Sequence, residues 1–456
     1  MDNRTLHDCL ADLDRDLLQR DAAVRVLLLG ALAGEHVLLI GPPGTAKSEL
    51  ARRLHRVFAG ARYFERLLTR FSVPEELFGP LSLRALEEDR YERLTDGFLP
   101  TAQVAFLDEV FKANSAILNA LLTRFNEREF DNGAGRIAAP LLCAIGASNE
   151  APSDESLLAF HDRFLVRVPV RPVGDASFAA LLRLDGRAPA PAATALDGGH
   201  VLAVAAARDD VTLGDEALAA LADLRAHAAQ QQLTVSDRRW RQLVGLMRTA
   251  AVTEGRTQLD LLDLWLAPYV VGHDEEAVPR LQAWLAAQLG AVAQPLTGLV
   301  NAVQGFEKQL EVEHSLPPEG AEGDDAAGKL SLAKAIAGPD DSGGMLRIVS
   351  DTLEDKTKRR FSPVHVSTRV AQVDELAARV QQARAAAADA LQALQARLAG
   401  RLWLPPELVD AWCGAHQATL AVADGLLARL AGTRAGFAAL RVDESLTGNA
   451  PPLPQP

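Results

Sequence analysis

The sequence predicts an α/β domain with a parallel sheet, then a small all-α domain and a C-terminal helical stalk split by an inserted small lobe. Three observations predict this fold. In the first 185 residues, short apolar runs typical of buried strands alternate with helical patterns. Between residues 201 and 275 the patterns are helical only. Beyond residue 275, apolar residues recur every three or four positions over three long stretches.

The strand-like runs of the first part all end in polar residues. A helical pattern over residues 2–33 precedes them. Because ligands bind outside the carboxyl ends of parallel strands, we expect these polar ends to form one site. The runs are HVLLI (36–40), ARYFERLLT (61–69), VAFLDE (104–109) and LLCAIGASNE (141–150).

Changes in composition mark the expected domain boundaries. A stretch rich in Pro, Ala and Gly ends the α/β part, and one rich in Gly, Pro and Asp interrupts the stalk. The predicted domains are an α/β domain (1–185), a linker and α-helical lid (186–275), a helical bundle or stalk (276–312 and 368–440), an inserted lobe that is β-rich or partly disordered (313–367) and a disordered tail (441–456).

Charge and cysteine usage exclude several classes of function. The 456-residue chain has a formal net charge of -13, which disfavours non-specific binding to nucleic acid. Its three cysteines lie far apart, without a CxxC or HExxH motif. The start is polar, and the apolar run 24–41 is interrupted by Glu35 and His36. We therefore expect a soluble, cytoplasmic protein without a transmembrane segment.

The stretch GPPGTAKS (41–48) follows an apolar run and precedes a helical pattern, as a phosphate-binding loop does. Lys47 would contact the β- and γ-phosphates of ATP, and the Ser48 hydroxyl would help hold Mg²⁺. The usual pattern has glycine in place of Ala46, which would cost roughly 1 kcal/mol if its φ is positive. A plain strand-to-helix turn is the alternative. The predicted binding residues are Gly41, Pro42, Pro43, Gly44, Thr45, Ala46, Lys47 and Ser48.

VAFLDE supplies a pair of carboxylates about sixty residues after the loop. Such a pair ends the second motif of nucleoside triphosphatases. Asp108 would orient Mg²⁺ and its water, so that Ser48 and Asp108 are the candidate metal ligands. Glu109 would polarise the attacking water as a general base. Two solvated carboxylates at a strand end are the alternative.

Three further residues complete the candidate site. Asn149, at the end of GASNE, could hydrogen-bond the γ-phosphate or the attacking water. Arg163, in DRF, could reach the γ-phosphate of a neighbouring subunit. Arg238, in SDRRW after the candidate helix cap Ser236, could approach the phosphates from the lid. An asparagine in a turn, a surface ion pair and a solvated helix face are the respective alternatives.

The ordered motifs resemble those of AAA+ ATPases, in particular the MoxR family and its RavA (regulatory ATPase variant A) group. The resemblance covers residues 1 to about 275. It implies that Asn149 is the first sensor, Arg163 the arginine finger and Arg238 the second sensor, with Arg167 and Arg239 as alternatives for the last two. The motifs are GPPGTAKSELARRL, TRFSVPEELFGPLSL, the segment 88–130, GASNE, DRFLVR and SDRRW.

The resemblance also implies an assembly and partners. Family members form rings, so we expect a homo-oligomer, a hexamer, that binds ATP and Mg²⁺ between subunits. They act as chaperone-like partners of proteins with a von Willebrand factor A domain, on a client that the sequence does not name. They also carry a β-hairpin inserted where this chain has residues 79–100. Two other functions stay open: a nucleotide-gated scaffold with little turnover, and a chelatase-type motor subunit.

Overall fold

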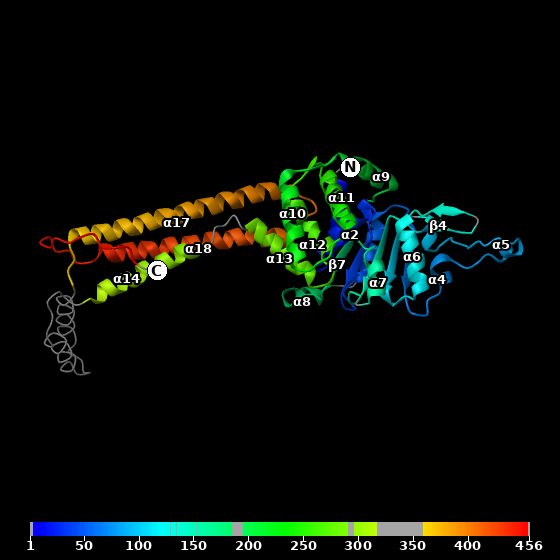
Figure 1. Cartoon of the computed structure of the whole chain (residues 1–456), viewed down its shortest axis with the longest axis horizontal. Helices are drawn as coiled ribbons and strands as arrows, with labels where there is room; N and C mark the ends of the chain where they lie inside the picture. The colour runs from blue at the N-terminus through cyan, green and yellow to red at the C-terminus, as the bar shows by residue number, and fades with distance from the viewer. Residues whose placement is uncertain are drawn as a thin grey trace, which may run out of the picture. The chain divides into compact units, whose positions relative to one another are not determined.

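The computed structural model describes residues 3–127, 129–133, 135–152, 154–184, 195–290, 296–316 and 359–454 (Figure 1). The chain divides into two compact units. The first comprises Met1–Gln288 with Leu398–Asp410, and the second comprises Leu289–Arg397 with Ala411–Pro456. Most of the expected inserted lobe, residues 317–358, lies outside the described residues. No described helix has both the length and the apolar character needed to cross a membrane.

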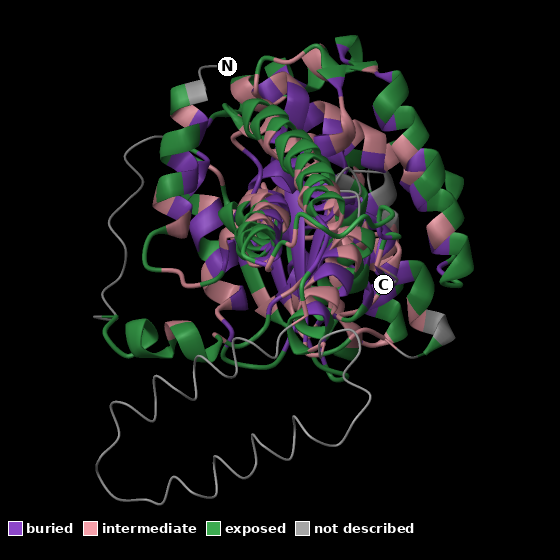
Figure 2. Ribbon diagram, turned by 90° about the vertical axis from the view of Figure 1, so that its left-hand side faces the viewer, coloured by how far each residue is buried: buried purple, intermediate pink, exposed green. Residues whose placement is uncertain are grey.

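The first unit is built on a parallel sheet, as the sequence predicts, and the sheet has a fifth strand, β7, beyond the four predicted runs. The strand order is β2-β3-β6-β1-β7, and the strands β1 and β6 at its centre are buried along their length (Figure 2). Ile40 pairs with Ser148, and Leu67 with Asp108, so these strands end at the same edge. The strands are β1 (Val37–Ile40), β2 (Tyr63–Leu67), β3 (Val104–Asp108), β6 (Cys143–Ser148) and β7 (Val166–Pro169).

The helical pattern over residues 2–33 forms two helices instead of one. Asp16 and Gln19 have positive φ values of 61° and 57°, which end one helix before the next begins. Helix α2 is buried along most of its length. The helices of this α/β domain are α1 (Asn3–Asp14), α2 (Asp21–Ala33), α3 (Lys47–Val57), α4 (Pro74–Phe78), α5 (Leu83–Glu87), α6 (Ser115–Glu127), α7 (Glu155–His161) and α8 (Asp175–Leu181).

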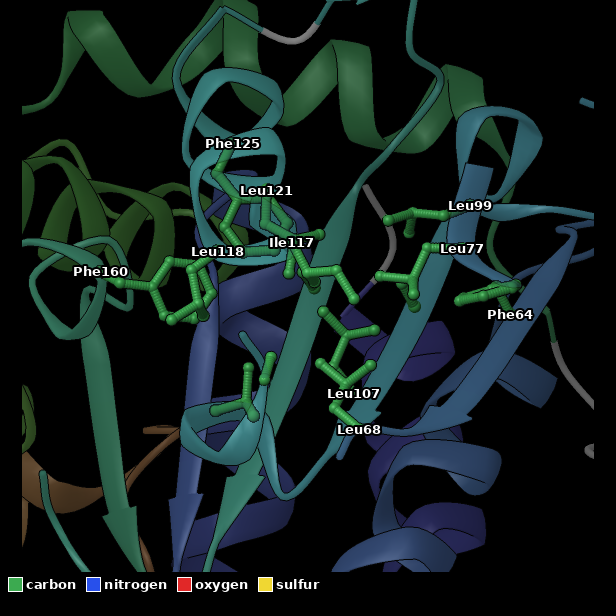
Figure 3. Packing of buried hydrophobic residues seen from close by; sticks show 14 of the residues in the cluster. Phe64, Leu68, Leu77, Leu99, Leu107, Ile117, Leu118, Leu121, Phe125 and Phe160 are labelled. Atoms are coloured by element: carbon green, nitrogen blue, oxygen red, sulfur yellow. The ribbon is translucent and has the colours of Figure 1, made fainter. Parts of the chain in front are cut away.

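The core of this domain lies between the sheet and helices α6 and α7. One buried cluster contains Ile117 and Leu121 of α6, Phe160 of α7 and Leu107 of β3 (Figure 3). Each fully buried side chain of this size stabilises the fold by roughly 1.5–3 kcal/mol relative to an exposed one. Gly146 permits the close packing, because a Cβ there would lie 2.8 Å from the Phe164 ring.

The expected hairpin at residues 79–100 forms only at its base, where two backbone hydrogen bonds join the antiparallel ends of the segment. The segment instead carries the short helix α5, capped by Ser82, and closes through one isolated bridge between Leu81 and Arg93. Its residues LRALE are good helix formers, which favours a helical turn over paired strands. A hairpin follows α6, with β4 (Glu129–Asp131) antiparallel to β5 (Arg136–Ala138).

The lid is almost entirely helical, and Ser236 caps α11 by accepting a hydrogen bond from the Arg239 backbone N–H. The expectation of helices alone needs one correction, because β8 (Thr212–Leu213) pairs with β9 (Gln258–Leu259). The helices are α9 (Gly198–Ala207), α10 (Asp215–Gln230), α11 (Asp237–Thr253), α12 (Ala267–Val271) and α13 (Ala277–Gly290), the last of which was expected to start the stalk.

Three helices of the described residues form the second unit: α14 (Thr297–Ser315), α17 (Pro363–Leu398) and α18 (Pro406–Ala438). Ion pairs of Arg384 with Asp424 and of Arg434 with Asp374 set α17 antiparallel to α18. Buried apolar residues of all three helices form their common core. This agrees with the predicted helical bundle.

The expected disorder of residues 441–456 does not hold for the described part of this segment. The carbonyl of Pro452 accepts a hydrogen bond from Arg369 at 2.6 Å, and that of Pro451 accepts one from Gln372 at 3.0 Å. Prolines lack an N–H but keep a carbonyl, and side chains of the bundle use these carbonyls as partners.

Candidate nucleotide-binding site

The loop 41–48 leaves β1 at the carboxyl edge of the sheet and leads into α3. Position 41 requires glycine because the backbone of Val170 approaches it closely: a Cβ there would lie 2.1 Å from the Val170 carbonyl oxygen. Gly44 has a φ of +80°. Ala46 has φ 70° and ψ 22°. Because this φ is positive, the cost of roughly 1 kcal/mol expected for an alanine at this position applies.

Lys47 is the first residue of α3, and its side chain is buried. Its ammonium donates to the carbonyl of Gly41 at 2.5 Å and to that of Pro42 at 3.0 Å. Burial lowers the pKa of Lys47, an effect that the carboxylates of Asp108 and Glu109 oppose. The cation is therefore held at the mouth of the loop, close to the two acidic residues that end the neighbouring motif.

Asp108 and Glu109 lie side by side at the end of β3. The backbone N–H of Glu109 donates to Asp108 Oδ1 at 3.0 Å, and burial raises the pKa of Asp108. Glu109 has φ 51° and ψ 44°, a left-handed conformation that costs a non-glycine residue about 1–3 kcal/mol. Strain of this kind concentrates at functional sites, where surrounding contacts hold it in place.

The structure brings Asn149 directly to Glu109. Asn149 Nδ2 donates to Glu109 Oε1 at 2.8 Å, across the gap between the ends of β6 and β3. Lys112 Nζ lies 3.1 Å from the same oxygen. No sequence motif marks Lys112, although its position three residues after Glu109 places it on the same side of a helical turn. The Glu109 carboxylate is thus fixed by an amide and a cation.

A cavity of about 960 Å³ opens beside the loop. Its size suits a bound nucleoside. Pro43 and Ala46 line it together with Arg20, whose Nε also donates to the Thr45 carbonyl at 3.3 Å. No motif marks Arg20, because it lies in the irregular segment between α1 and α2.

Arg163 and Arg238 lie at the other edge of the sheet. Arg163 precedes β7, whose first residue Val166 pairs with Val37, the first residue of β1. The loop 41–48 follows the last residue of β1, so the length of the strand, about 10 Å, separates the two edges. The proximity of Arg238 contributes to the lowered pKa of Arg163, for which burial is the larger cause. The two guanidinium groups are therefore neighbours.

Arg167 and Arg239, the alternatives to these two residues, are buried and bonded within the chain. Arg239 donates to Asp162 Oδ1 at 2.9 Å and to the Val270 carbonyl at 2.9 Å. Arg167 donates to the Gly272 carbonyl at 3.3 Å. Both guanidinium groups thus stabilise the contact between lid and α/β domain.

Arg163 and Arg238 have a different environment. The Nε of Arg163 is buried without a hydrogen-bond partner among the described residues. Arg238 is exposed and makes no hydrogen bond or ion pair within the described part of the chain. Of the four arginines, these two remain able to bind an anion from outside.

Comparisons with known proteins find relatives of the α/β domain and the lid. A family model described as the MoxR domain in the MoxR-vWA-beta-propeller ternary systems matches residues 4–195, and a model described as an AAA lid domain matches residues 216–285. Two uncharacterized proteins of Methanocaldococcus jannaschii are each 38% identical, over 265 and 270 residues. These matches each cover 58% of this chain, and 69% and 70% of the respective relatives.

Two further similarities are more distant. The chaperone MoxR1 of Mycobacterium tuberculosis is 29% identical over 171 residues, which are 36% of this chain and 44% of that protein. A solved structure of a candidate ATPase from Cytophaga hutchinsonii, 17% identical, covers 60% of this chain and 87% of its own with a TM-score of 0.50, which supports the fold. The two family models, and the two relatives that this chain covers to more than two thirds of their length, show that the chain belongs to the MoxR family of AAA+ ATPases.

Proposed function

We propose that this protein hydrolyses ATP in a ring of identical subunits, with each ATP bound between two of them. One observation carries the proposal. Lys47, Asp108, Glu109 and Asn149 gather at one edge of the sheet, whereas the free arginines Arg163 and Arg238 lie at the opposite edge. A closed ring of head-to-tail contacts brings these two edges together between neighbours.

In this site each residue has a separate task. Lys47 and the loop N–H groups bind the β- and γ-phosphates. Glu109, held by Asn149, orients and deprotonates the attacking water. Arg163 and Arg238 of the next subunit neutralise the charge that develops on the γ-phosphate, a contribution worth about 10³–10⁵ in rate in other phosphoryl-transfer enzymes.

The residues present also fit Mg²⁺. The ion prefers oxygen ligands and keeps several waters, so one carboxylate, one hydroxyl and phosphate oxygens suffice. Asp108 provides a half-buried carboxylate whose Oδ1 is oriented by the Glu109 N–H, and Ser48 lies in the first turn of α3. A Mg²⁺ held by Asp108 and Ser48 would supply positive charge that neutralises the phosphates.

The proposed role in the cell is chaperone-like remodelling of a protein client. The matching family model is described by systems with a von Willebrand factor A domain protein, which supports such a protein as the partner. A hexameric ring, membership of the RavA group and a cytoplasmic location are further parts of this proposal. The helical bundle of the second unit, to which we assign client recruitment, supports a RavA-like organisation.

Steady-state phosphate release tests the enzymatic part. Glu109→Gln is expected to bind ATP with unchanged affinity and to hydrolyse it at least about 100-fold more slowly, because the general base is lost. Glu75→Gln, a change of the same kind in α4, serves as the matched control and is expected to keep the wild-type rate. Equal rates for wild type and Glu109→Gln would contradict the proposal and favour the nucleotide-gated scaffold.

A further inference from the structure

The last described residues lie against the helical bundle of the second unit. After α18 the chain returns to the start of α17, where the Phe361 N–H donates to the Arg441 carbonyl at 2.8 Å and the Asp443 N–H donates to the Phe361 carbonyl at 2.9 Å. Farther along, Gly448 passes so close to the bundle that a Cβ there would lie 2.8 Å from Ser362 Oγ. The segment after α18 is therefore seated on the surface of the bundle.

Residues 446–454, which we call the proline tail, are held at two consecutive prolines. The Pro451 carbonyl accepts a hydrogen bond from Gln372 Nε2 at 3.0 Å. The Pro452 carbonyl accepts one from Arg369 Nη1 at 2.6 Å. Pro451 is buried, whereas the other residues of the tail are partly or fully exposed. The tail has no charged side chain, so the bundle holds it through two carbonyls and one buried ring.

A buried network fixes Arg369 for this contact. Arg369 Nε donates to Glu313 Oε1 at 3.0 Å, and its Nη2 lies 2.9 Å from the same oxygen. His365 Nε2 lies 2.9 Å from the other oxygen of this carboxylate. Arg369 and Glu313 are only 3% and 4% exposed. Arg369 Nη1 also donates to Gln372 Oε1 at 3.1 Å, so the two donors that hold the tail are oriented together.

The cost of this network points to a role beyond packing. A buried ion pair has to recover the desolvation of both charges, and apolar residues of similar volume often stabilise a core equally well. Stability alone therefore does not account for Glu313 and Arg369. The pair supplies a guanidinium and, through Gln372, an amide that are held in place at the surface of the bundle, which lowers the entropy lost when a segment binds to them.

The chemistry of this site suits a proline-rich segment. Proline fixes its own φ, so a run of prolines is extended before it binds and loses little entropy on binding. Its carbonyls make no hydrogen bonds within the segment and can accept them from side chains. Aromatic-lined surfaces bind such segments in other proteins. Phe361, stacked on His365 with ring centroids 4.8 Å apart, provides an aromatic side chain where the segment after α18 first meets the bundle.

We propose that Arg369 and Gln372 form a binding site for a proline-rich segment of a partner protein, and that the proline tail covers this site until such a segment displaces it. The tail seated there defines the class of ligand: an uncharged segment with two consecutive prolines. Because two carbonyls and one ring hold the tail, it can exchange with a competitor. This inference rests on the recruitment role proposed above for the bundle, and it names the kind of segment that is recruited.

Binding of the peptide NAPPLPQP, which has the sequence of residues 449–456, tests the site. The full chain is titrated into the labelled peptide, and binding is followed by fluorescence anisotropy. Pro451→Gly together with Pro452→Gly releases the tail, because glycine removes both the buried ring and the fixed φ. We expect this released-tail variant to bind the peptide at least about tenfold more tightly than the wild type, in which the linked tail competes at a high effective concentration.

Two further substitutions, made in the released-tail variant, locate the bound peptide. Gln372→Ala should weaken peptide binding at least about fivefold, since one of the two carbonyl donors is lost. Gln381→Ala removes an exposed glutamine of the same helix and should leave binding unchanged. Gln372 is chosen over Arg369 because the loss of Arg369 would leave the buried Glu313 carboxylate without its guanidinium partner.

Octaproline represents a partner segment of unrelated sequence. We expect unlabelled octaproline to compete with the labelled peptide for the released-tail variant, and failure to compete would confine the site to this chain's own tail and overturn the inference. Equal peptide affinities of the wild type and the released-tail variant, or equal affinities after Gln372→Ala and Gln381→Ala, would also overturn it. Phosphate release is measured in parallel: it would persist if only the peptide site failed, whereas its absence beside intact peptide binding would contradict the proposed ATP hydrolysis alone.

Discussion

The backbone of the nucleotide-binding loop allows a graded prediction at three positions. Ala46 has a positive φ of 70°, Gly44 has φ +80° with no atom within 4 Å of an added Cβ, and Gly41 has a Cβ position only 2.1 Å from the Val170 oxygen. The three sites thus separate backbone strain from steric clash. The variants are Ala46→Gly, Gly44→Ala and Gly41→Ala.

The magnitudes follow from these geometries. Ala46→Gly relieves strain of about 1 kcal/mol in the folded protein and adds about 0.5–1 kcal/mol of chain entropy to the unfolded state. Its free energy of unfolding should therefore change by less than about 0.5 kcal/mol. Gly44→Ala should destabilise the protein by about 1 kcal/mol through strain alone. Gly41→Ala should cost more than either, because backbone has to move.

Urea unfolding and titration with a fluorescent ATP analogue check the series. We expect ATP affinity to be intact or slightly tighter in Ala46→Gly, weaker in Gly44→Ala and lost in Gly41→Ala. Loss of ATP binding in Ala46→Gly would refute the view that alanine is merely tolerated here. Equal effects of the two glycine substitutions would refute the distinction between strain and clash.

Three further predictions concern single side chains. Asn149→Ala should lower the rate of ATP hydrolysis about 10-fold to 100-fold without weakening ATP binding, because Glu109 loses the amide that orients it; an unchanged rate would remove Asn149 from the site. Burial lowers the pKa of His161 to about 2, so below pH 6.5 only the unfolded chain gains this proton, and the free energy of unfolding should fall by up to about 1.4 kcal/mol per pH unit. Urea unfolding at pH 7, 6 and 5 measures this dependence. The free energy of unfolding of His161→Gln should fall less steeply with decreasing pH than that of the wild type, and an equally steep fall in both proteins would contradict the assignment. Arg239→Ala should destabilise the protein by about 3–5 kcal/mol, since it removes the donor that the buried carbonyls of Phe164, Leu165 and Val270 share. Arg238→Ala should stay within about 0.5 kcal/mol of the wild type and lose hydrolysis. Similar free energies of unfolding of the two variants would contradict the assignment of Arg239 as the structural arginine and Arg238 as the one that binds an anion.

Much of the nucleotide-binding edge could be predicted from the sequence because its signals are local. A buried strand followed by a loop, or by Asp-Glu or Asn, places its polar end at the carboxyl edge of a parallel sheet. Strand β7 was missed because Arg167 and Pro169 interrupt its apolar pattern, and the charge is compensated only by tertiary partners such as the Gly272 carbonyl.

The positions of the arginines could not be predicted in the same way. Arg238 and Arg239 are adjacent in sequence, yet one is exposed and the other is 3% exposed in a network with residues far along the chain. The difference in burial between these two neighbouring residues depends on which side of α11 faces the α/β domain.

The central claim is that one subunit supplies the nucleotide-binding loop and its neighbour the arginines. Mixing two inactive variants tests it directly. Lys47→Ala keeps both arginines, and Arg163→Ala keeps the loop, so in a randomly mixed ring about one site in four combines an intact loop with intact arginines. We predict that an equimolar mixture recovers up to about a quarter of the wild-type ATP hydrolysis rate, and no recovery, in a mixture shown to form mixed rings, would contradict the claim.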